Sequence, residues 1–155
     1  MARRMSRAKR LGVFLDGARE GQSILETILG EISGTEGVIT REEIDHAQEE
    51  INKAENHVEV AKDGVDELKE EIGSWKENME GANMEHLPKY DEVSECYDAL
   101  ETAYDSLDNI DWPDVSHATI TEDAREEIEA AIQDALDALE SAIEEAEQAS
   151  FPSMF

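Results

Sequence analysis

The sequence is poor in aromatic residues, prolines and cysteines. Aromatic residues make up 5% of the 155 residues, and the three prolines all lie after position 87. Because proline interrupts helices, residues 1–87, which contain no proline, are free to form long helices. This aromatic content and a hydrophobic content of 39% are low for a compact enzyme. They are normal for an elongated bundle in which each helix buries a single stripe.

The lone cysteine, Cys96, cannot form a disulfide within the chain. Its neighbours Val93, Tyr97 and Leu100 indicate a helix, so we expect an interior thiol. The basic N-terminus is followed only by a short apolar stretch that Asp16 interrupts, which predicts neither a signal peptide nor a membrane span. We therefore expect a protein of a reducing, cytoplasmic compartment, not a secreted or membrane protein.

Basic residues are few and unevenly placed. The chain has 13 Lys and Arg against 40 Asp and Glu, a net charge of −27. Residues 1–10 hold five bases and no acid, so the other 145 residues carry 8 basic and 40 acidic side chains, a net charge of −32. Such a body repels nucleic acid and anionic membranes and attracts basic protein surfaces.

The strongest positive signal is an apolar stripe between Ile44 and Met79. Apolar residues recur there at alternating steps of three and four, which keeps them on one face of a helix. Thr40 and Glu43 form a capping pattern at its start, and we predict a helix over 40–80. The stripe that must pack against neighbouring helices includes Ile44, Ile51, Val58, Val65, Leu68, Ile72 and Trp75.

Three further helices are predicted, over 6–32, 90–109 and 121–150. The first shows the same rhythm at Leu11, Leu15, Ala18, Gln22, Leu25, Leu29 and Ile32. The third shows it at Val93, Tyr97, Leu100, Tyr104 and Leu107, and Thr119 or Thr121 is expected to cap the fourth. We predict an all-α acidic domain over 6–150, built of antiparallel helical hairpins as an elongated four-helix bundle with coiled-coil packing. Because the second helix is about twice as long as the third, part of its stripe must be covered by the first helix, the fourth helix or another subunit. We also expect the chain to form a homo-oligomer.

Motifs for catalysis or metal binding are weak. Glu43 and His46 have the Glu-x-x-His spacing of di-metal bundles, but no second such pair lies on a helix. The aspartates at 105, 108, 111 and 114 do not fit a calcium loop, and the histidines lack partners at metal-ligand spacing. We expect no enzyme, no metal and no cofactor.

The two ends differ from the acidic domain. Residues 1–10 form a basic arm with Arg3, Arg4, Arg7 and Arg10. In a helix, Arg3, Arg7 and Arg10 would share one face. Direct nucleic-acid binding is not expected except through this arm, which supplies only a few phosphate contacts and lies beside a strongly acidic body. Folding back onto the chain's own acids, or disorder, explains the arm at least as well. Residues 151–155 form an apolar tail with Phe151, Met154 and Phe155.

Three short motifs resemble small acidic coiled-coil proteins of tailed phages and other mobile elements. They are Ser6-Arg7-Ala8-Lys9-Arg10-Leu11, Trp75-Lys76-Glu77-Asn78-Met79 and Asp98-Ala99-Leu100-Glu101. The resemblance covers most of residues 6–110 and implies a mobile-element origin. It transfers no active residue.

Two hypotheses follow for function. In the first, acids along the helices imitate a line of phosphates, and the chain docks on a basic, nucleic-acid-processing or host-defence protein as a DNA-mimic inhibitor does. The acids expected to bind are Glu49, Glu59, Asp63, Glu70, Glu127, Asp134 and Glu144. In the second, the chain is a structural or scaffolding component of a viral particle, assembled through its stripe and through docking of its arm or apolar tail into a neighbour.

Overall fold

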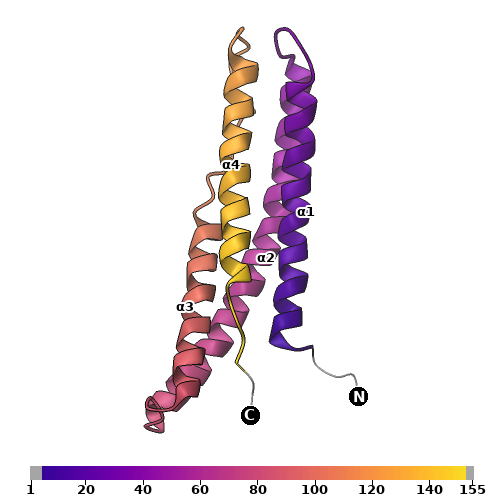
Figure 1. The fold of residues 1–155 in the computed structure, drawn as a ribbon. Helices are drawn as coiled ribbons and strands as arrows, with labels where there is room; N and C mark the ends of the chain where they lie inside the picture. Colours follow the sequence, from indigo (N-terminus) through magenta and orange to yellow (C-terminus); the bar gives the residue numbers. More distant parts are fainter. Residues whose placement is uncertain (1–4, 153–155) are drawn as a thin grey trace.

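The computed structural model describes residues 5–152 and contains four α-helices in that range. They are α1 (Arg7–Ser33), α2 (Arg41–Gly81), α3 (Pro88–Asp108) and α4 (Ala124–Glu147). Successive helices run in opposite directions, and the α2–α3 hairpin protrudes beyond the start of α1 and the end of α4 (Figure 1). The predicted all-α class and antiparallel bundle are confirmed.

Helix α2 is the spine of the molecule. It packs against α1 and α3, and α4 packs against the same two helices. The backbones of α2 and α4 do not approach each other closely, so the two helices occupy opposite corners of the bundle, and the Arg125–Glu43 ion pair at 2.7 Å links them at one end. The short α3 lies beside only the second half of α2 (Figure 1).

The connection over 109–123 takes the place of a helix beside the first half of α2. Its side chains Ile110 and Val115 are buried in the core. Gln48 of α2 accepts a hydrogen bond from the Val115 N–H at 2.6 Å, and Arg41 donates to the Ser116 and Ala118 carbonyls at 3.0 and 3.1 Å. Together, α1, α3 and this connection cover the stripe of α2 within one chain, and Val58, Val65 and Ile72 are each at most 1% exposed. Covering it does not require a second subunit.

Helix starts follow local capping chemistry. Ser6 accepts a hydrogen bond from the Lys9 N–H, and Thr40 and Glu43 form the reciprocal capping box expected from the sequence. The expected start of α4 at a capping threonine is wrong: the helix begins at Ala124, and its preceding residue, Asp123, makes no side-chain cap. The reason is that the chain, after α3 ends at Asp108, still follows an irregular path at 119–121.

Three details of the predicted stripes are also wrong. In α1 the buried residues are Gly21 and Ile28 rather than Gln22 and Leu29. In α3, Ala103 is buried, whereas Tyr97 and Tyr104 are only partly covered; Cys96 is buried, as expected of an interior thiol. Trp75 is half-buried rather than in the core, because it lies at the edge where the Arg7 guanidinium covers its ring.

Candidate interaction surface

The outward face of α4 is uniformly acidic. Its only basic residue, Arg125, is buried. No described cation forms an ion pair with any of the exposed acids Glu126, Glu127, Asp134, Asp137, Glu140 or Glu144. Only near the end of the helix is one acid, Glu147, paired, with Arg19 of α1 at 2.7 Å. This face therefore presents a row of carboxylates to solvent.

The seven predicted acids are all exposed but do not form one surface. Glu127, Asp134 and Glu144 lie on α4, whereas the other four lie on α2 at the opposite corner of the bundle. The α2 group is also less purely anionic, because Glu59 pairs with Lys62 of the same helix at 3.2 Å. The structure thus separates the prediction into two faces, of which that of α4 is the more negative.

Arg125 was not singled out from the sequence, and it ties α4 to the α1–α2 loop. Its guanidinium donates to the carbonyls of Ile32 and Gly37 at 3.1 Å each and to the Glu43 carboxylate at 2.7 Å. This hydrogen bond lowers the pKa of Glu43. Gly37 has φ +91°, a conformation that favours glycine and that orients its carbonyl. The sequence feature that could have identified Arg125 is that it is the only base in an otherwise acidic helix.

The basic arm is partly folded onto the chain's own acids. Arg10 donates to both oxygens of the Glu71 carboxylate, at 2.9 and 2.6 Å, and Arg7 donates to it at 3.0 Å. Hydrogen bonds from Arg10 and Arg7 lower the pKa of Glu71 to about 2 against the opposing effect of burial. Arg3 and Arg4 lie outside the described residues. Two of the four predicted arm arginines are therefore committed to holding α1 against α2.

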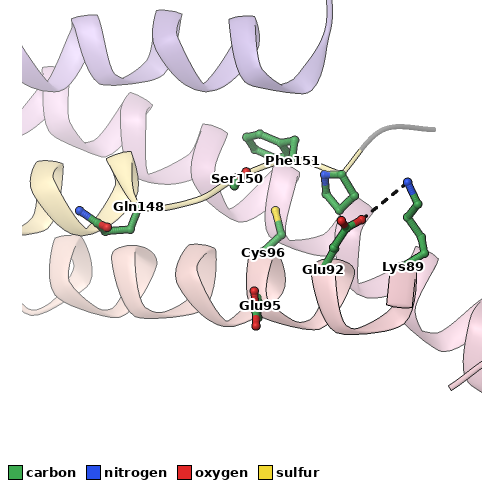
Figure 2. Close-up of a pocket in the computed structure, with 8 residues that line it drawn as sticks. Lys89, Glu92, Glu95, Cys96, Gln148, Ser150 and Phe151 are labelled. Carbon is green, nitrogen blue, oxygen red and sulfur yellow. Dashed lines mark ion pairs between the residues drawn. The ribbon is translucent and has the colours of Figure 1, made fainter. Parts of the chain in front are cut away.

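The C-terminal segment after α4 lies against its own bundle. Phe151 is partly buried on the core, beside a cleft of about 280 Å³ that Cys96 also lines. Figure 2 shows the Cys96 sulfur pointing from α3 toward this segment, while Glu95 points away. Burial raises the pKa of Cys96 to about 11, so the thiol is protonated at neutral pH. Met154 and Phe155, the other predicted docking residues, lie outside the described part of the chain.

The two residues of the weak metal motif each contact another side chain of the chain. Glu43 is held by Arg125, and His46 faces Glu31 with 3.2 Å between Nε2 and the carboxylate. Residues 5–152 contain no group of three or more His, Cys, Asp or Glu side chains that could hold a metal ion. Among the same residues no helix is long and apolar enough to cross a membrane.

Fold and surface together define an all-α, four-helix bundle with a strongly anionic exterior. The sequence matches no protein-family model, and neither a curated protein nor a solved structure is significantly similar to it.

Proposed function

We propose that this chain is a non-enzymatic interaction module that docks its acidic helical surface on a basic, nucleic-acid-binding protein, as DNA-mimic inhibitors of mobile elements do. The observation that carries the proposal is the face of α4, where exposed carboxylates follow one another without an exposed base. A linear array of negative charge attracts the same basic clefts that attract the phosphates of DNA.

The α4 face is a better candidate for this contact than the α2 face. The exposed acids of α2 share their helix with Lys53, Lys62 and Lys69, each paired with an acid of α2 itself. Such pairs reduce the local negative potential and lower the attraction for a cationic partner. Homo-oligomer formation remains a prediction, and the proposal does not depend on it.

The test is competition for a basic partner. Purified basic DNA-binding proteins are each bound to fluorescently labelled duplex DNA, and the full chain is added at low ionic strength. We expect the chain to displace the DNA from at least one of them, and added salt to weaken the displacement because the contact is electrostatic.

Two variants with equal loss of charge locate the contact. Glu127→Gln/Asp134→Asn/Glu144→Gln removes three acids of α4, and Glu49→Gln/Asp63→Asn/Glu70→Gln removes three of α2. The α4 variant should displace the DNA less well than the α2 variant. Absence of displacement from every protein tested would refute the proposal, and equal effects of both variants would refute the assignment to α4.

A further inference from the structure

A groove lies between the 109–114 part of the connection and α4. Its volume is about 350 Å³. The apolar part of its lining includes Trp112, Ala131 and Ala138, and three aspartates also line it, Asp111, Asp114 and Asp134, of which Asp114 accepts hydrogen bonds from Ser116. It opens beside the acidic face of α4, because Asp134 belongs to both.

The segment that carries Trp112 is fixed in place. Ile110 and Val115 on either side of it are buried, at 6% and 4% exposure. The side chain of Gln48 bonds the backbone of this segment twice, accepting from the Val115 N–H and donating to the Pro113 carbonyl at 3.4 Å. The groove therefore exists before a ligand arrives, which reduces the entropic cost of binding.

Three other aromatic rings of the bundle, those of Trp75, Tyr97 and Tyr104, lie next to a cation of the chain. The Arg7 guanidinium lies 5.9 Å from the Trp75 ring centre, and Lys69 and Lys76 lie 4.7 and 5.3 Å from the Tyr104 and Tyr97 rings. Arg7 also bonds a carboxylate, that of Glu71. Trp112 has carboxylates beside it, but no cation of residues 5–152 lies over its ring.

We propose that the groove accepts an arginine side chain of the basic partner, whose guanidinium lies against Trp112 and among Asp111, Asp114 and Asp134. This inference rests on the proposed function and names one anchoring contact within it. A planar guanidinium is weakly hydrated, stacks on an aromatic face and donates to more than one carboxylate at once, which a lysine ammonium does less well. The pair Arg7 and Trp75 supplies the same combination inside the chain.

The experiment uses the full chain labelled with ¹⁵N and two defined probes, hexa-arginine and hexa-lysine peptides. The two tryptophan indole N–H signals are followed by NMR, and the signal lost in Trp112→Phe identifies Trp112. We expect hexa-arginine to shift the Trp112 signal while the Trp75 signal, already covered by Arg7, stays in place. Hexa-arginine should bind about two- to five-fold more tightly than hexa-lysine.

Matched charge variants test the carboxylates. Asp111→Asn/Asp134→Asn should weaken hexa-arginine binding more than Glu49→Gln/Glu70→Gln, which removes the same charge from α2. Trp112→Leu should weaken it by about two- to five-fold, with circular dichroism to check that the variant is folded.

Each outcome decides between the groove and the wider surface. If hexa-arginine binds but the Trp112 signal does not move, or if the two double variants have equal effects, arginine does not bind in the groove. Neither result affects the test of the proposed function by DNA competition. A Trp112 shift that depends on protein concentration without peptide would assign the groove to a second copy of the chain and overturn the arginine proposal. If the groove variants fail in the peptide assay as expected but no basic protein is displaced from DNA, the proposed function falls and the arginine site remains.

Discussion

The two flanks of α2 are held by opposite arrangements of charge. Toward α1, the acid lies on α2: Glu71 receives Arg7 and Arg10, and the Arg10 side chain is only 13% exposed. Toward α3, the bases lie on α2: Lys62 pairs with Asp108, whose side chain is 53% exposed, and two further lysines lie over tyrosine rings. The first flank thus has a multiply bonded, partly buried carboxylate, and the second has long side chains lying along aromatic surface.

The two flanks also differ in how tightly they are packed around the glycines of α2. At Gly64, on the α1 flank, an added Cβ would meet the body of the Phe14 ring at 2.4 Å. At Gly73, on the α3 flank, it would meet only the edge of the Tyr97 ring, at 3.0 Å. Helix α1 is therefore packed on α2 with little spare volume, whereas small ring movements can make room on the α3 flank.

The largest expected effect is therefore that of Gly64→Ala. Alanine is favoured over glycine within a helix by about 1 kcal/mol, but the displaced Phe14 ring should outweigh this gain. We expect a net loss of about 2 kcal/mol in the free energy of unfolding, measured by urea denaturation.

Two other glycines are the controls for this comparison. Gly73→Ala should be neutral or mildly stabilising, and Gly12→Ala, where an added Cβ meets nothing within 4 Å, should stabilise by up to about 1 kcal/mol. If Gly64→Ala were as stable as Gly73→Ala, the two flanks would not differ in packing.

The second effect concerns the charge of Glu71. Glu71→Gln should lower the free energy of unfolding by about 1–2 kcal/mol at neutral pH, because Arg10 and Arg7 lose their charged partner. Glu67→Gln is the matched control on the same helix. The Glu67 carboxylate accepts one bond from Arg10 and its side chain is 61% exposed, so its loss should have much less effect.

The pH dependence of this effect has a definite sign. The pKa of Glu71 in the folded chain, about 2, is below its ordinary value of 4.5. The stabilisation is therefore present above about pH 4.5 and is lost as the pH falls toward 2. Because acid also relieves the repulsion of a chain with net charge −27, the measured quantity is the difference in stability between wild type and Glu71→Gln. A difference that persists unchanged at pH 2 would contradict the assignment.

The fold could be predicted because α2 carries a long, regular stripe. Residues from Ile44 to Ile72 face the core as the spacing requires, and the capping box at Thr40 marks the start. The register of α1 was less predictable. Gly21 is buried because α2 approaches it closely: an added Cβ would meet Val58 Cγ2 at 2.9 Å and the Ala54 carbonyl oxygen at 3.0 Å. A pattern based on hydrophobicity does not identify a glycine as a contact residue.

The candidate surface was predictable in composition but not in arrangement. Exposed acids follow from charge and periodicity alone, whereas the placement of α2 and α4 at opposite corners depends on the path of the 109–123 connection. That path is fixed by Gln48 and by two buried side chains, Ile110 and Val115, which have no repeating pattern. For the same reason the groove beside Trp112 could not be inferred from the sequence.

The smallest expected effect belongs to the lysines on the α3 flank. Lys69 lies 4.7 Å from the centre of the Tyr104 ring and also pairs with Asp66 at 3.3 Å. Lys69→Met keeps the length of the side chain and removes its charge, so we expect a loss of about 0.5 kcal/mol. A double-mutant cycle with Tyr104→Leu isolates the contact between cation and ring, and the coupling free energy should be about 0.5 kcal/mol. If the two single effects were additive, the lysines would stabilise this flank only through their carbon chains. Charge would then contribute to stability on the α1 flank of α2 but not on the α3 flank.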